Sequence, residues 1–361
     1  MRNKSEDPSI LVYCAKSLKP NLLNLSKSAQ RLLNRSNIED VHDIRVASRR
    51  ISAVLDSFSD FLPGKKAKSW KKEIGSITKS FGKVRDIDVQ LDWIKEILTK
   101  TDDKKLHAGI RRIKLRLDQK RRERQDHTTE TTASLMGSAT IQEITQWVDT
   151  ILASGDENIQ FSPSLYQLGY KQIQNRLDEF LFYEVFIFDT QRVEELHAMR
   201  ICAKKLRYAL EVFSDLYLQE TDFAQNITRQ AQDYLGEIHD CDVWIDYLPK
   251  FMEKEFIRIK EFYGYTRPYS RIRPGIEYLI LNRQEERQRL YRDFLKDWKE
   301  WKLKETWLNL RKVIFLTSLE MQSQQSLSPS ISFHEMPIEE ETPDGHENDA
   351  QDPDTQVDLN S

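Results

Sequence analysis

Residues 42–58 read HDIRVASRRISAVLDSF, and residues 197–213 read HAMRICAKKLRYALEVF, which aligns with the first stretch without a gap. A second pair follows: residues 81–94 read FGKVRDIDVQLDWI, and residues 235–248 read LGEIHDCDVWIDYL. The copies are offset by 155 residues in the first pair and by 154 in the second. Two separate matches at nearly one offset indicate an internal duplication.

Apolar residues recur at helical spacing along nearly all of residues 1–321, which predicts an all-α fold. The clearest stripe has the spacing of a helix packed in a bundle and consists of Trp70, Ile74, Ile77, Phe81 and Val84. Gly82 and Gly236 are interpreted as tight turns or close helix approaches where a helix ends. Four aspartates follow them at matched positions: Asp86, Asp88, Asp240 and Asp242. We interpret these as caps of the next helices, with magnesium binding beside a phosphate as the alternative.

Composition divides the chain into four segments. We predict a first helical-bundle repeat at 1–130, a linker with a short helix at 131–162 and a second helical-bundle repeat at 163–321. Residues 322–361 form an acidic, Ser- and Pro-rich stretch with few large apolar residues, which predicts a disordered tail.

The charge of the chain is unevenly distributed. The whole chain carries −3, but residues 322–361 contain ten acidic residues and no Lys or Arg, which leaves +7 for residues 1–321. The basic body therefore favours an anionic partner. Three cysteines, Cys14, Cys202 and Cys241, are too few for a disulfide framework or a Cys-based zinc site, and we expect them to be small buried residues.

Each copy of the first repeated helix carries a row of basic side chains beside its apolar face. The first row is formed by His42, Arg45, Arg49 and Arg50. The second row is formed by His197, Arg200, Lys204, Lys205 and Arg207. Like charges on one helical stripe repel each other by a few tenths of a kcal/mol per pair, so a linear polyanion would remove a cost that the rows otherwise carry. Interhelical ion pairs are the alternative interpretation.

Other features of this surface are less specific. The histidines are interpreted as hydrogen-bond donors that face phosphate, with buried core residues or metal ligands as the alternatives. Metal ligation is disfavoured because no second ligand stands at i+3 or i+4. Three lysines, Lys72, Lys79 and Lys83, lie opposite the Trp70 stripe, and the matching places in the second copy hold Asn226, Asp233 and Glu237. We therefore expect an asymmetric site. The basic run from Arg111 to Arg124 is interpreted as a solvated helix face.

These motifs resemble those of the CHAD family, the conserved-histidine α-helical domain. The resemblance rests on the His-x-x-Arg-x-x-x-(Arg/Lys)-(Arg/Lys) helix, the run from Lys204 to Glu211, and the Gly-x-(Val/Ile)-x-Asp-x-Asp-Val block in both copies. It covers residues 8–320 or so and implies two four-helix bundles related by pseudo-twofold symmetry within one domain. It also implies that a basic central groove binds inorganic polyphosphate.

The resemblance implies a set of ligand contacts, carried over position by position. These are His42, Arg45, Arg49, Arg50, His197, Arg200, Lys204, Lys205 and Arg207, followed by Lys72 and Lys79. The first copy departs from the second at Ser52, where the counterpart is Arg207, so its basic row is shorter.

We therefore expect a non-enzymatic polyphosphate binder with no cofactor and no metal, which serves recruitment to polyphosphate or its sensing. Two alternatives stay open: recognition of RNA or DNA by the same groove, and a magnesium-dependent polyphosphate or triphosphate hydrolase. No P-loop or nucleophile constellation is present in the sequence. No apolar run reaches the ~18 residues that span a bilayer. We expect a cytoplasmic protein without a membrane partner, associated with polyphosphate granules, whose acidic tail is a candidate contact for a protein partner.

Overall fold

The structure is a computed structural model that describes residues 7–34, 37–154 and 161–327. Within these ranges the chain forms helices and no β-strand, which confirms the all-α prediction. The first repeat contains α1 (Pro8–Asn34), α2 (Ile38–Ser57), α3 (Gly64–Lys100), α4 (Lys104–Glu123), α5 (Gln125–Met136) and α6 (Ala139–Ser154). The second contains α7 (Pro163–Leu181), η1 (Phe182–Phe186), α8 (Val193–Val212), α9 (Ser214–Tyr217), η2 (Leu218–Thr221), α10 (Asp222–Tyr263), α11 (Tyr269–Leu303) and α12 (Thr306–Leu327).

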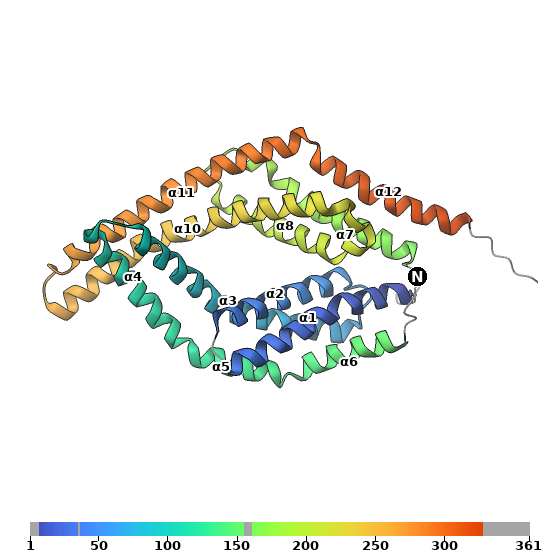
Figure 1. Ribbon diagram of the computed structural model, residues 1–361, viewed down its shortest axis with the longest axis horizontal. Coiled ribbons are helices and arrows are strands. Elements are labelled where there is room, and N and C mark those ends of the chain that lie inside the picture. The colour runs from blue at the N-terminus through green and yellow to red at the C-terminus, as the bar shows by residue number, and fades with distance from the viewer. Residues whose placement is uncertain (1–6, 35–36, 155–160, 328–361) are drawn as a thin grey trace, which may run out of the picture.

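The duplication is visible in the arrangement of the helices. Both ends of α2 and α8 are offset by 155 residues, and α1 to α4 correspond in order to α7, α8, α10 and α11. Figure 1 shows α1, α2, α5 and α6 as a lower layer and α7, α8, α10, α11 and α12 as an upper layer. The two layers contact each other where α2 packs on α8 and, at one end of the molecule, where α4 packs on α11.

Equivalent residues of the two repeats meet at the pseudo-twofold axis. The rings of Phe58 and Phe213, which close α2 and α8, have centroids 5.5 Å apart, and both side chains are fully buried. At the other end, α4 and α11 cross at Gly109 and Gly275, whose Cα atoms lie so close that a Cβ on either would meet the other at 2.9 Å. Glycine is required here because the two backbones touch.

Two apolar cores hold the layers together. The larger core takes side chains from both repeats, including Leu18, Ile51, Trp70, Phe180 and Trp298. The smaller core fills the crossing of α3, α4, α10 and α11 with residues such as Ile94, Ile113, Leu248 and Leu279. The three cysteines are buried and free, as expected.

The interpretation of Gly82 and Gly236 as helix ends is wrong. Helix α3 continues through Gly82 to Lys100, and α10 continues through Gly236 to Tyr263. The buried stripe of α3 runs on through Ile87 and Leu91, and this packing outweighs the ~1 kcal/mol that glycine costs inside a helix. The four aspartates are consequently mid-helix residues and not caps.

The segment between the repeats is more helical than the sequence predicts. Instead of one short run at 141–151, it forms α5 and the 16-residue α6, both of which pack on α1. At the other end, α12 extends to Leu327, past the expected start of the tail at residue 322. The predicted disordered tail otherwise lies outside the described residues, and the segment boundaries stay predictions.

Candidate functional site

The two basic rows meet where α2 packs on α8. Arg45 and Arg49 project from α2, and Arg200 and Lys204 project from α8; we call these four residues the basic cluster. Each lies at an intermediate depth, neither buried nor fully exposed. The i, i+4 spacing places each pair on one face of its own helix, and the packing of Phe58 on Phe213 at the helix ends holds the two helices together.

The cations of the basic cluster destabilise one another's charged forms. Burial, followed by the charges of Arg49, Arg200 and Arg45, lowers the pKa of Lys204 to about 8. Burial and the charge of Arg49 lower the pKa of Arg45 to about 10, although Asp86 acts in the opposite direction. Burial is the larger cause of both shifts, and repulsion between cations of the two repeats adds to it.

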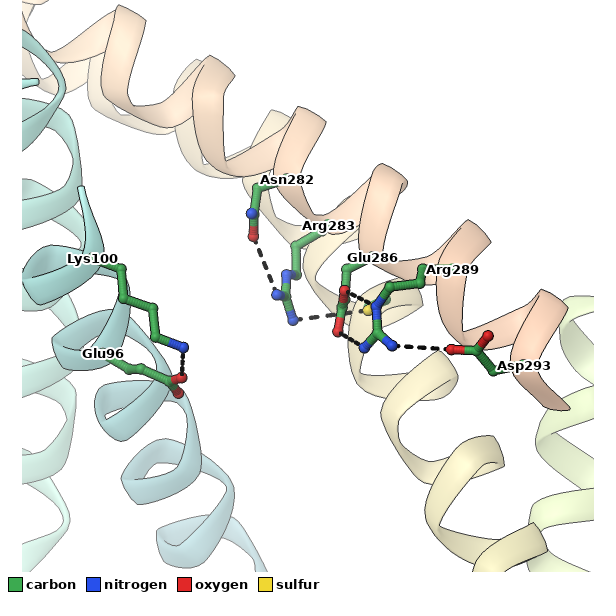
Figure 2. A network of polar contacts seen from close by, with 8 residues as sticks. Glu96, Lys100, Asn282, Arg283, Glu286, Arg289 and Asp293 are labelled. Atoms are coloured by element: carbon green, nitrogen blue, oxygen red, sulfur yellow. Dashed lines mark hydrogen bonds and ion pairs between the residues drawn. The ribbon is translucent and has the colours of Figure 1, made fainter. Parts of the chain in front are cut away.

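The side chains of the basic cluster make no ion pair and no hydrogen bond with another residue of the described part of the chain, although Ser48 donates to the backbone carbonyl of Arg45. Helix α11 shows the ordinary arrangement for comparison (Figure 2). There Arg289 bonds Glu286 at 2.6 Å and Asp293 at 3.0 Å, at i−3 and i+4. The basic face of α11 is paired with its own carboxylates, whereas Asp86 and Asp240 act on Arg45 and Arg200 without forming ion pairs with them.

Gly82 makes room for one of these cations. A Cβ on Gly82 would lie 2.4 Å from Nη1 of Arg45, so the guanidinium rests directly on the backbone of α3. At the equivalent place, Gly236 of α10 faces Nε of Arg200, which lies 3.7 Å from a Cβ position. Gly82 is therefore needed to make room for Arg45, whereas a Cβ at Gly236 would fit beside Arg200.

Three of the expected site residues are held by carboxylates. Glu211 of α8 pairs with Arg50 of α2 at 3.3 Å and with Arg207 of its own helix at 3.3 Å. Lys205 pairs with Glu179 of α7 at 3.6 Å. The ion-pair interpretation of the rows therefore applies to their edges, whereas the basic cluster lies between them.

The second repeat contains a pair of histidines. The rings of His197 and His239 lie with centroids 4.1 Å apart and are tilted by 33°, and their Nδ1 atoms are 3.0 Å apart. Burial and the charges of Arg200 and His197 lower the pKa of His239 to about 4, and burial lowers that of His197 also. Both rings are therefore neutral at pH 7, and one Nδ1–H donates to the other.

The remaining expected contacts lie on α2 and α3 of the first repeat. His42 is partly buried on α2 and forms no side-chain hydrogen bond within the described residues. Lys72 and Lys79 are exposed on α3 and are likewise without an ion-pair partner there.

The aspartates of the second motif have two different environments. Asp88 is buried and accepts a 2.7 Å hydrogen bond from Nε of Arg121, and Asp242 accepts one from Arg287 in the equivalent position. Asp86 and Asp240 instead influence the basic cluster: Asp86 raises the pKa of Arg45, and Arg200 lowers that of Asp240 against the larger effect of burial. Within the described ranges, no group of three or more His, Cys, Asp or Glu side chains could hold a metal ion.

The interpretation of residues 111–124 as a solvated face is wrong for three of its arginines. Arg112 and Arg116 bond the fully buried Glu255 of α10, with Nε to carboxylate distances of 2.5 and 2.8 Å. Arg121 holds Asp88, as described above. This run therefore ties α4 to the other repeat and to α3.

One residue near the basic cluster, His239, was missed by sequence reasoning. His239 stands in the aligned block opposite Arg85, so a basic side chain at this position in both copies was the available signal. Asp86 and Asp240 were noticed, but their role beside Arg45 and Arg200 depends on α3 and α10 passing next to α2 and α8.

Comparisons with known proteins agree with one another. A family model described as the CHAD domain matches residues 17–249. The CHAD domain from the plant Ricinus communis is 18% identical, covers 77% of this chain and 96% of its own, and superposes with a TM-score of 0.53. PptA from Streptomyces chartreusis is 15% identical, with 80% and 98% coverage and a TM-score of 0.50. At such identities these two structures show the fold alone. No curated protein matches the chain.

Proposed function

This chain belongs to the CHAD domain family, and on that premise we propose that it binds inorganic polyphosphate at the basic cluster, without catalysing a reaction on it. The family is associated with polyphosphate. Recruitment to polyphosphate, or sensing of it, is the role that such binding serves.

The observation that carries the proposal is the unbalanced charge at the repeat boundary. Arg45, Arg49, Arg200 and Lys204 come together from two helices without a carboxylate partner among the described residues. A polymer with one negative charge per phosphate would neutralise these cations one after another, because the cations are spaced along the two helices. Binding then gains the Coulomb energy that the unliganded site lacks.

Each cation type contributes differently to such a site. The guanidinium groups of Arg45, Arg49 and Arg200 donate paired hydrogen bonds to phosphate oxygens, and Lys204 acts as a compact charge. A neutral His197 or His239 has an N–H to donate. His42, Lys72 and Lys79 extend the proposed contacts outward from the basic cluster. Arg50, Lys205 and Arg207 contribute once the polymer displaces the carboxylates of Glu211 and Glu179 from them.

The test is calorimetric titration with long-chain polyphosphate. Arg45, Arg49, Arg200 and Lys204 are changed together to Ala, and the control changes four ion-paired surface lysines, Lys19, Lys95, Lys250 and Lys304, so that net charge falls equally. We expect loss of binding in the first variant only. The logarithm of the wild-type affinity should fall with the logarithm of salt concentration with a slope of about −3.

Two outcomes would redirect the assignment. Displacement of polyphosphate by RNA at equal phosphate concentration would favour a nucleic-acid module. Release of inorganic phosphate that depends on magnesium and on Asp86 and Asp240 would make the protein a hydrolase. We expect neither, because the basic rows carry few aromatic side chains for stacking on bases, and arginines hold Asp88 and Asp242.

A further inference from the structure

The turn between α10 and α11 exposes an unusual group of aromatic side chains. Phe262 is 80% exposed, Tyr265 is 55% exposed and Tyr263 is 50% exposed. They contact one another, with ring centroids 4.8 Å apart for Phe262 and Tyr263 and 5.9 Å apart for Tyr263 and Tyr265. On α10, Ile257 is also exposed. Grouped apolar exposure of this kind marks a surface that contacts something else.

The backbone presents this group at the tip of the molecule. Gly264 ends α10 in the left-handed conformation, with φ of 73°, and α11 starts at Tyr269. Figure 1 shows the α10–α11 turn at the extreme end of the long axis, far from α2 and α8. The turn is therefore convex and separate from the basic cluster.

Basic side chains surround the aromatic group. Lys260, Arg267 and Arg271 are exposed, and their side chains make no ion pair and no hydrogen bond with a described residue. Between residues 256 and 271 the chain has four basic residues and one acidic residue, Glu261. We call Phe262, Tyr263, Tyr265, Lys260, Arg267 and Arg271 the apex patch.

We propose that the apex patch docks on an anionic lipid surface. Phe262 and the tyrosine rings enter the boundary between headgroups and acyl chains, and the three cations contact lipid phosphates at the rim. A convex tip, with Ile257 also exposed on α10, suits a lipid interface. It suits single-stranded nucleic acid less well, because proteins that bind such a strand follow it along a groove and stack its bases on free ring faces. Phe262 and Tyr263 already pack edge to face.

This proposal departs from the expectation of no membrane partner, which rested on the lack of a spanning segment. Among the helices described, none is both long and apolar enough to cross a bilayer. The contact is therefore at the surface of the bilayer, reversible and sensitive to salt.

Flotation with vesicles tests the proposal on the full chain. Vesicles of phosphatidylcholine alone are compared with vesicles that also contain phosphatidylglycerol. We expect binding to the anionic vesicles only, and the pair Arg267→Ala and Arg271→Ala should weaken it about 30-fold. The double variant Phe262→Ala with Tyr265→Ala should abolish flotation. The control, Phe315→Ala with Leu316→Ala, removes exposed apolar side chains from α12 and should float like the wild type.

A second measurement reports insertion directly. Because the three native cysteines are buried, Phe262→Cys can be labelled selectively with a polarity-sensitive dye. A blue shift on anionic vesicles supports insertion of the tip. The proposal would be overturned if the wild type did not float, or if the apex variants floated as well as the wild type. It would also be overturned if the apex patch bound oligouridine and not vesicles, or if the protein self-associated through the tip. Polyphosphate titration of the same variants should be unchanged, since the apex patch lies outside the basic cluster.

Discussion

The guanidinium of Arg45 rests on Gly82, so closely that a Cβ at residue 82 would stand 2.4 Å from Nη1. Helix α3 is continuous through this glycine, so no turn requires it. Glycine inside a helix costs about 0.5–1 kcal/mol relative to alanine. Only a residue without a Cβ leaves room for the guanidinium of Arg45 at this place, within the basic cluster and beside Arg49.

Replacement of Gly82 distinguishes its role in polyphosphate binding from its effect on the stability of the fold. In Gly82→Ala, the flexible end of Arg45 has to move, while the helix gains about 0.5–1 kcal/mol. We expect equal or higher thermal stability together with severalfold weaker polyphosphate binding. Gly236→Ala is the matched control, because its Cβ would meet Arg200 at an ordinary 3.7 Å, and it should bind like the wild type. Equal affinity of both variants would contradict a role for Gly82 in the site.

Lys204 makes the proposed binding dependent on pH. Its pKa of about 8 means that the free site loses this charge as pH rises through 8, although an ordinary lysine keeps it beyond 10. We expect polyphosphate affinity at pH 9 to be about tenfold lower than at pH 7. Lys204→Arg should show a flatter profile, because arginine stays protonated.

The same shift has the opposite effect on folding. The pKa of Lys204 is lowered in the folded state, so the unfolded chain holds the proton more strongly. Stability therefore rises with pH between about 8 and the ordinary lysine pKa of ~10.4, while affinity falls. Thermal denaturation of wild type and Lys204→Arg across this window measures the effect, and parallel profiles would contradict it.

Glu211 is expected to restrain binding. Its carboxylate pairs with Arg50 and Arg207 next to the basic cluster. Glu211→Gln frees both cations and raises the local positive charge, so polyphosphate should bind about two- to fivefold more tightly. Titration at two salt concentrations checks this, with Glu179→Gln, which frees the more exposed Lys205, as a milder comparison.

The composition of each basic row was predictable, because it depends only on helical spacing within α2 or α8. That the two rows meet could not be predicted in this way. It depends on packing between Phe58 and Phe213, and no local pattern states that two equivalent helices face each other. The partner of Arg50 illustrates the difficulty, since Glu211 lies 161 residues away in the sequence.

The errors at Gly82 and in the run 111–124 have a common origin. Propensity and charge were read locally, whereas the structure places each segment against the other repeat. A buried stripe carries α3 through its glycine, and a buried carboxylate of α10 recruits Arg112 and Arg116 from what reads as a solvated face. Glu255 itself stands in a helical, charged stretch that gives no sign of burial.

Glu255 should be important for stability and not for the proposed binding. Burial raises its pKa, but hydrogen bonds from Arg116, Arg112 and Arg258 outweigh that effect and leave the pKa lowered. Its stabilisation is therefore present above pH ~4.5 and lost as pH falls through the lowered value. Glu255→Gln should reduce the unfolding free energy by about 2–4 kcal/mol at pH 7. Urea denaturation measures the loss, and unchanged polyphosphate affinity is the internal control.

The crossing of α4 and α11 gives a test of the pseudo-twofold contact. A Cβ on Gly109 would lie 2.1 Å from the carbonyl oxygen of Ile272, and one on Gly275 would lie 2.1 Å from that of Leu106. Backbone atoms cannot move aside as a side chain does, so the helices have to separate and the smaller core opens. We expect Gly275→Ala to cost about 3 kcal/mol of unfolding free energy.

Gly75 provides the matched control for that substitution. It lies in α3, is exposed, and has nothing within 4 Å of its Cβ position. Gly75→Ala should therefore be neutral or stabilise the protein by up to about 1 kcal/mol. Comparison of urea midpoints isolates the contact from helix propensity, since both changes add the same methyl group within a helix. If Gly275→Ala proved as stable as Gly75→Ala, the two repeats would not be held by backbone contact at Gly109.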